Sequence, residues 1–407
     1  MWRGFDVGPA QTPGLTSPAT CSRLGSGMGG TFSAHGEHKG NPVRKHGLVP
    51  LTSVRISYAW RVEFMRRWTL FLMFVICCSA CVTVFAQDID PLARLKQVSA
   101  FPKIDVKLLL DGEILSKRGP LMTFPTGISS QLCFAVPTSP AETVKRLQTW
   151  DPTRCSSLKV YAAHDLNDPA ELKEFNNIHL FLEPGDHPVR WLWDQTLATT
   201  DRRSDLNLTR VEAQELARCV GKSPDTKTMG DCWGQVLFAR LSDFQRNGFA
   251  SSLSYEFDVA PINPAAHLLS LVQEQPLVAR EFVPLLRRAG LVNGAAAMPS
   301  IRPTYYWRLF EAGHHATFSL GTVYLLDAGD HYKLLDIEYY VSGTYYTSAT
   351  LYEIWPIRDG ERRGSLVWCN VLCSAPMFRF ASGIERLASS IILTLEFKKC
   401  VRCFQES

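Results

Sequence analysis

The sequence lacks the short motifs that identify several large enzyme classes. It has no Gly-x-Ser-x-Gly nucleophile elbow, no phosphate-binding P-loop and no His-Glu-x-x-His zinc motif. These absences argue against an ordinary α/β-hydrolase, a P-loop nucleotidase and a zinc metalloprotease. One Gly-x-Gly-x-x-Gly match begins at Gly25, but it follows no predicted strand and opens no helix, so we interpret it as chance. No cofactor, metal site or catalytic residue is predicted from motifs.

A basic cluster is also missing from most of the chain. The full sequence has 43 Lys and Arg and 39 Asp and Glu, a net charge of +4, but residues 1–86 hold nine basic and three acidic residues. Residues 87–407 therefore carry 34 basic and 36 acidic residues, a net charge of −2. Because nucleic-acid binding needs a concentrated excess of Lys and Arg, no nucleic-acid partner is expected.

Residues 65–86 have the layout of a secretory signal peptide. Arg66 and Arg67 precede the apolar run 68–78, and small residues lead to Ala86 before the polar Gln87. We therefore expect a periplasmic or secreted bacterial protein that begins at Gln87. Two alternatives would attach it to a membrane: an uncleaved anchor, or lipidation at Cys81.

Residues 1–64 show no sustained periodicity and contain ten Gly and five Pro. Such a segment buries too little apolar surface to offset its chain entropy. We interpret it as a disordered or non-translated extension, which leaves the true start codon open. Residues 87–407 are then expected to form a single domain.

Residues 87–407 contain eight cysteines, which permits disulfides in an exported protein. Free thiols and zinc ligands are the alternatives. Cys369 and Cys373 lie in a predicted strand, where four residues span about 13 Å, so one metal ion could not easily bind both. The sequence does not decide between thiols and disulfides.

The N-terminal half of this domain is predicted to mix strands with one helix. Residues 103–116 suggest a hairpin that turns at Asp111 and Gly112. Ser139 and Pro140 are typical of a helix start, and this helix should end near Pro152. Further strands are expected at 131–136, 158–163 and 175–182.

The middle of the domain, about 191–300, is predicted to be a helical insertion. Thr209 and Glu212 have the spacing of a capping box, and a second helix should run from Asp231 to Gly248. Two more helices should begin at Pro264 and Pro276, with Pro284 splitting the last one.

The last third is predicted to be four strands followed by a long helix. The strands are expected at 315–326, 331–341, 345–357 and 364–373, separated by tight turns. A helix over 383–404 would have two apolar stripes, and a helix of that kind is usually buried on both sides. One stripe is Ile384, Leu387, Ala388, Ile391 and Leu395; the other is Leu393, Phe397, Cys400 and Phe404. A strand over 391–397 is the alternative.

Together these elements predict an α+β fold, in which a curved antiparallel sheet packs on a long C-terminal helix and carries a helical insertion. The order, with residues 111–113 and 137–144 as its opening, loosely resembles the helix-grip topology of START-like domains. The tail 364–389 also resembles an uncharacterised family of exported bacterial proteins, over roughly the last 100 residues. That resemblance implies export and no particular activity.

Aromatic residues supply the candidate binding site. Tyr and Trp combine apolar area with a polar handle, which suits a ligand cavity or a partner surface. The predicted ligand-binding residues are Tyr305, Tyr306, Trp307, Tyr339, Tyr346 and Trp355. Ordinary core packing would explain the same residues.

Three functions stay open at this point. The favoured one is an exported non-enzymatic protein that binds a small apolar molecule or an apolar partner in an aromatic-lined groove. The first alternative is a hydrolase-type envelope enzyme that uses His314 or His315 as a base. The second is an envelope scaffold without a pocket.

Overall fold

The computed structural model describes residues 90–180, 185–201, 204–222, 224–256, 260–293, 301–381 and 383–407. These residues belong to one compact unit, Ala86–Ser407. The predicted extension, 1–64, and the predicted signal peptide, 65–86, lie outside the described residues.

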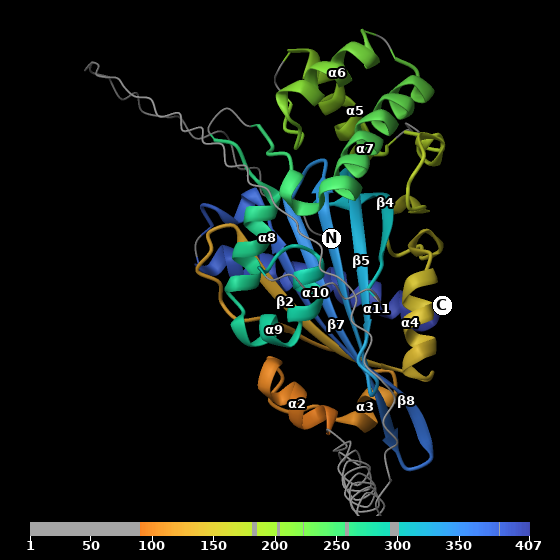
Figure 1. Ribbon diagram of the computed structural model, residues 1–407, viewed down its shortest axis with the longest axis vertical. Helices are drawn as coiled ribbons and strands as arrows, with labels where there is room; N and C mark the ends of the chain where they lie inside the picture. The colour runs from red at the N-terminus through yellow and green to blue at the C-terminus, as the bar shows by residue number, and fades with distance from the viewer. Residues whose placement is uncertain are drawn as a thin grey trace, which may run out of the picture. The chain divides into compact units, whose positions relative to one another are not determined.

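The centre of this unit is a curved, eight-stranded antiparallel sheet (Figure 1). Its strand order is β1-β2-β8-β7-β6-β5-β4-β3, so β1 and β3 are the edges. The strands are β1 (Leu115–Arg118), β2 (Gly127–Val136), β3 (Val160–Leu166), β4 (Pro303–Ala312), β5 (His315–Asp327), β6 (Tyr332–Val341), β7 (Thr347–Asp359) and β8 (Arg362–Ser374). The four predicted strands of the last third are all present, as β5 to β8.

One face of the sheet is covered by the helical insertion and the first helices of the unit. These helices are α2 (Pro91–Val98), α3 (Val106–Leu110), α5 (His187–Ala198), α6 (Arg210–Val220), α7 (Thr226–Asn247), α8 (Pro264–Gln273), α9 (Pro276–Glu281) and α10 (Val283–Arg288). Short 3-10 turns lie at η1 (Pro152–Arg154), η2 (Leu172–Phe175), η3 (Thr199–Asp201), η4 (Gly248–Ser251) and η5 (Pro376–Phe378). The largest apolar cluster forms on this face, and we call it the insertion face.

The opposite face packs against α4 (Pro140–Thr149) and α11 (Gly383–Glu406). Alternation along β8 separates the two faces: Leu366 and Trp368 belong to the insertion-face cluster, while Val367 and Cys369 belong to the other. The sheet therefore lies between two helical layers. The predicted α+β fold, with its long C-terminal helix and its helical insertion, is confirmed.

Several predicted helix starts are present with their capping contacts. The Ser139 hydroxyl accepts a hydrogen bond from the Glu142 amide at 3.3 Å, and α4 begins at Pro140. Thr209 and Glu212 form the reciprocal capping box, with bonds of 3.1 and 2.8 Å. These caps satisfy amides that the first turn of a helix leaves without partners.

The predicted hairpin over 103–116 is wrong. Asp105 accepts hydrogen bonds from the amides of Lys107 and Leu108 and caps the short helix α3 instead. Gly112, at φ 93°, turns the chain into β1, which pairs with β2. The predicted turn at Asp111 and Gly112 is present, but it joins helix α3 to strand β1 instead of joining two strands.

The predicted strand over 175–182 is also wrong for its described part, 175–180, which contains no strand. Phe175 ends the turn η2, and this segment packs under α7, where Gly230 and Gly234 allow close backbone approach. A Cβ on Gly230 would lie 1.9 Å from the Ile178 carbonyl oxygen. Helix α7 also begins earlier than predicted, at Thr226, because Asp225 accepts from the Thr228 amide at 2.7 Å.

The prediction that α11 is buried on both apolar stripes is wrong. The stripe that contains Phe404 packs on the sheet, and Phe404 itself is 3% exposed. The other stripe faces outward: Ile384 is 81% exposed and Ile391 is 49% exposed. The sheet offers α11 one packing surface, and no second layer covers its far side among the described residues.

Candidate functional site

The six predicted aromatic residues are all buried, at 6% exposure or less. Five belong to the insertion-face cluster: Tyr305, Trp307, Tyr339, Tyr346 and Trp355. Tyr306 points to the opposite face of the sheet, as strand alternation requires. The six side chains therefore do not line one common groove, and their contact with a ligand stays a prediction.

The contacts of these aromatics are those of a packed core. Tyr339 stacks on Phe244 with ring centroids 3.8 Å apart, and Trp307 donates a hydrogen bond to the Glu174 carbonyl oxygen at 3.3 Å. The cavity beside Tyr339 has a volume of about 20 Å³, enough for about one water molecule.

A larger hollow, of about 370 Å³, lies where the end of α11 meets the turn after α3. It is lined by Leu109, Leu110, Asp111, Gly112, Ala135, Pro137, Arg402, Gln405 and Glu406. None of the predicted aromatic residues lines it.

The two candidate histidines lie at the tip of the β4–β5 hairpin in different surroundings. His314 is 95% exposed, and its Nδ1 lies 3.3 Å from a carboxylate oxygen of Glu311. His315 stacks on Trp191 with centroids 4.0 Å apart, and burial lowers its pKa. The pair therefore gives one solvent-exposed imidazole beside a carboxylate and one covered imidazole. Their use in hydrolysis stays a prediction.

A polar cluster on the α11 side of the sheet was missed by sequence reasoning. Tyr306 donates a hydrogen bond to Asp336 at 2.7 Å, and the guanidinium of Arg308 lies 4.0 Å over the Tyr306 ring. Gly321 makes room for that ring, because a Cβ there would lie 2.0 Å from the Tyr306 Cζ atom. The contact joins three adjacent strands, β4, β5 and β6.

Glu338 extends this cluster, two residues further along β6 and on the same face. It accepts hydrogen bonds from the hydroxyls of Tyr345 and Ser348, at 2.5 and 2.6 Å. Burial raises the pKa of Asp336 to about 6, although Arg308 acts in the opposite direction. A carboxyl with that pKa can exchange a proton near neutral pH, but neither cavity described above is lined by Asp336 or Glu338.

Among the described residues, a strongly exposed apolar surface lies on α11. We call it the α11 outer face, and it consists of Ile384, Leu387, Ala388, Ile391, Ile392 and Leu395. Leu387, Leu395 and Ile392 are 40%, 52% and 60% exposed. Met377 and Phe380, just before the helix, are 66% and 89% exposed. Contiguous exposed apolar side chains of this kind commonly mark interaction surfaces.

The inner side of α11 is held to the sheet by polar contacts at intervals along the helix. Arg386 donates to the carbonyl oxygens of Phe124 and Gly127, at 2.7 and 2.9 Å. The hydroxyls of Thr394 and Ser130 are 2.7 Å apart, and Gln405 donates to the Ala135 carbonyl oxygen at 2.9 Å. These contacts fix which side of the helix faces outward.

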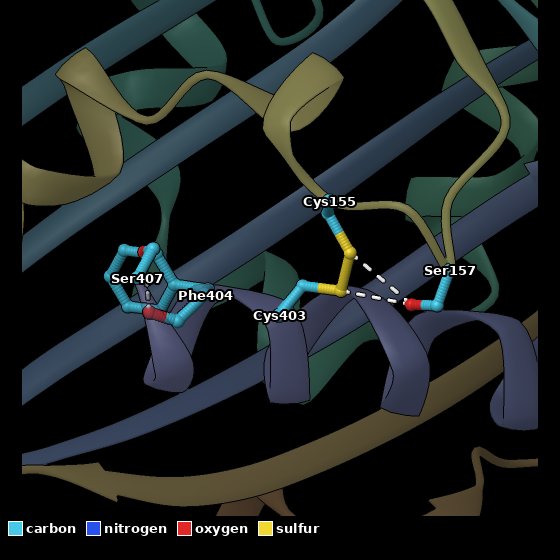
Figure 2. Close-up of a disulfide and its surroundings, with 5 residues drawn as sticks. All are labelled: Cys155, Ser157, Cys403, Phe404 and Ser407. Atoms are coloured by element: carbon cyan, nitrogen blue, oxygen red, sulfur yellow. Dashed lines mark hydrogen bonds between the residues drawn. A yellow bond between two sulfur atoms is a disulfide. The ribbon is translucent and has the colours of Figure 1, made fainter.

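A disulfide between Cys155 and Cys403 ties the last turn of α11 to the segment before β3 (Figure 2). The Ser157 hydroxyl lies 3.2 and 3.0 Å from the two sulfurs and is the hydrogen-bond donor to them. A second disulfide joins Cys219 to Cys232, between α6 and α7. The helix is thus attached covalently as well as by packing.

The remaining four cysteines of this unit, Cys133, Cys369, Cys373 and Cys400, are free thiols. Burial raises the pKa of Cys373 to about 12 and that of Cys400 to about 11. In the described part of the chain, no three His, Cys, Asp or Glu side chains are grouped as metal ligands. Nor does any helix there combine the length and apolarity needed to cross a bilayer.

No family model, curated protein or solved structure matches the chain. The resemblances to START-like domains and to a family of exported bacterial proteins therefore stay predictions.

Proposed function

We propose that this chain is an exported, non-enzymatic binding protein that contacts an apolar partner through the α11 outer face. The observation that carries the proposal is the row of exposed Ile and Leu side chains on a helix whose other side is firmly attached. An apolar partner is also what the sequence predicts, but the proposed binding surface is now on α11 instead of on the aromatic residues.

Export is supported by the signal-peptide layout of residues 65–86 and by the cysteine pairing. Two disulfides, Cys155–Cys403 and Cys219–Cys232, suit an oxidising compartment such as the periplasm.

Binding through α11 is supported by the distribution of exposed apolar residues, which are scattered over the rest of the surface but contiguous on α11. Single exposed residues such as Leu121 on a loop, Val211 on α6 and Leu277 on α9 are ordinary for a folded surface. On α11, Ile384, Leu387, Ile391 and Leu395 instead follow one another at three- and four-residue steps, so they form one continuous strip. A partner that covers this strip removes its apolar surface from water, and this burial favours binding by roughly 25 cal/mol per Å².

The test is titration of residues 87–407 with an apolar fluorescent dye. All three apolar clusters lie within this unit, and a cooperative melt verifies its folding. The double variant Ile391→Ser/Leu395→Ser should bind the dye at least about threefold more weakly, an energy of ~0.65 kcal/mol. Leu277→Ser is the matched control, because Leu277 and Leu395 are both 52% exposed on helices.

Equal dye binding by the wild type and the double variant would overturn the proposal. So would a hydrolytic activity of the purified protein that disappears in His314→Ala or His315→Ala. That second result would favour the enzyme alternative.

A further inference from the structure

We infer that the insertion face of the sheet holds a second binding site, which takes a neutral, hydroxyl-rich small molecule such as a monosaccharide. This face is the opposite side of the sheet from α11, so the inference goes beyond the proposed function and does not depend on it. It is carried by a group of buried polar side chains whose hydrogen-bonding atoms have no protein partner among the described residues.

The group lies on the neighbouring strands β2, β8, β7 and β6. The register places Gln131 opposite Asn370 and Trp368 opposite Glu353. Glu353 in turn lies opposite Lys333. These five side chains are buried, at 5% exposure or less. The register therefore brings polar residues from four strands together in the core, where apolar residues are usual.

Several atoms of this group have no hydrogen-bond partner in the described part of the chain. They are two side-chain amide nitrogens, two indole nitrogens, one amide oxygen and one carboxylate oxygen, on Gln131, Gln275, Trp355, Trp368, Asn370 and Glu353. Buried polar atoms are nearly always paired, because an unpaired one has lost its bonds to water without replacing them. So many unpaired atoms in one place indicate a partner from outside the chain.

The chemistry of that partner follows from the mixture of donors and acceptors. The charges of the group already balance: Lys333 Nζ lies 2.9 Å from Glu353 and 3.5 Å from Glu281, and Arg94 pairs with Glu281. An anion would be repelled by the carboxylates and a cation by Lys333 and Arg94, so a neutral ligand fits best. Because a hydroxyl group both donates and accepts, a ring of hydroxyls can pair with neighbouring donors and acceptors at once.

Helix α2 and the segment after it lie over the group. The Ala100 amide donates a hydrogen bond to Gln131 Oε1 at 2.6 Å, and the Arg94 guanidinium lies 5.4 Å from the centre of the Trp355 ring. This cover is thin, since among the eight residues of α2 only Leu95 is buried. Segments with few buried apolar contacts open at low free-energy cost. The ligand would therefore enter when α2 moves away from the sheet.

The experiment is calorimetric titration of residues 87–407, purified without sugar or glycerol, with D-glucose, D-galactose and N-acetyl-D-glucosamine. At least one should bind with a dissociation constant of about 1 mM or lower. Trp368→Phe, which removes an unpaired indole NH, should weaken that binding at least about fivefold, or ~1 kcal/mol. Trp355→Phe should do the same, and it serves as the second variant if Trp368→Phe fails to melt cooperatively.

Trp233→Phe is the matched control, because Trp233 is equally buried but donates its indole NH to Thr196 at 3.1 Å. It should change sugar binding less than about twofold. Arg94→Ala tests the cover: freeing α2 from Glu281 should speed sugar binding about two- to fivefold in stopped-flow tryptophan fluorescence, as expected for the loss of one ion pair.

Three results would overturn the inference. The first is that none of the three sugars binds, and a crystal structure pairs the unpaired atoms with ordered water only. The second is sugar binding that neither Trp368→Phe nor Trp355→Phe weakens. The third is binding that Trp233→Phe weakens as strongly as they do. None of these results changes dye binding at the α11 outer face, so the two proposals can fail separately.

Discussion

Asp336 should make this protein less stable above pH 6 than below it, and Asp336→Asn should remove that loss. Burial is the main cause of its raised pKa of about 6, and Glu338 adds to it. Because the folded-state pKa lies above the unfolded value, the folded state binds the proton more tightly. The resulting stabilisation is fully present below the unfolded pKa, near 4, and is lost as the pH rises through 6.

The magnitude follows from the size of the shift. The pKa rises from 3.8 to about 6, and each pH unit is worth ~1.4 kcal/mol, so the ceiling is about 3 kcal/mol. Asparagine keeps an oxygen that can accept from the Tyr306 hydroxyl, which now donates to Asp336 at 2.7 Å. Arg308 loses a nearby carboxylate in this variant, so we expect a gain of about 1–3 kcal/mol at pH 8 and almost none at pH 4.

Urea denaturation of both proteins at pH 4 and pH 8 measures this difference. Asp225→Asn is a control of opposite sign. The Thr228 amide hydrogen bond lowers the pKa of Asp225, so this variant should lose stability at both pH values, because that stabilisation disappears only as the pH falls below 3.8. A difference between Asp336→Asn and wild type that is the same at both pH values would refute the reasoning. It would mean that Asp336 is ionised without cost in the folded protein.

Three further predictions concern stability and processing. Gly321→Ala should cost about 1–3 kcal/mol in urea unfolding by crowding the Tyr306 ring, whereas Gly383→Ala, with nothing within 4 Å, should be near neutral. Cys403→Ser should cost about 2–5 kcal/mol and more than Cys219→Ser, because its disulfide spans 248 residues and the other spans 13; equal losses would contradict this. N-terminal sequencing of exported protein should begin at Gln87, and a product that begins at Met1 would refute the signal peptide.

The parts of the fold that the sequence predicts well have local causes. The strands β5 to β8 are rich in β-branched and aromatic residues between clear turns, and the Ser139 and Thr209 caps depend on residues three positions apart. Strand β4, Pro303–Ala312, was missed because Tyr305, Tyr306 and Trp307 are all buried. A strand covered on both faces shows a continuous apolar run rather than alternation.

The Asp336–Tyr306 contact and the exposure of one α11 stripe depend on long-range packing, so the sequence alone could not predict them. Asp336 meets Tyr306 only because β4, β5 and β6 are adjacent, and in the sequence the two residues are 30 positions apart. The apolar stripes of α11 predicted a buried helix, because periodicity reports which residues share a side and not how many layers pack against it. The sheet, α4 and the segment before β3 contact the inner side of this helix, and among the described residues no layer covers its outer stripe.

The most direct test of the α11 outer face places a polarity-sensitive dye on Ile391→Cys, with Leu277→Cys as the control. We expect a water-like spectrum at residue 391 in buffer and a blue shift when micelles of a nonionic detergent supply an apolar surface, with a smaller shift at residue 277. A spectrum at residue 391 that is already apolar in buffer, or that does not change with micelles, would contradict the exposed binding face.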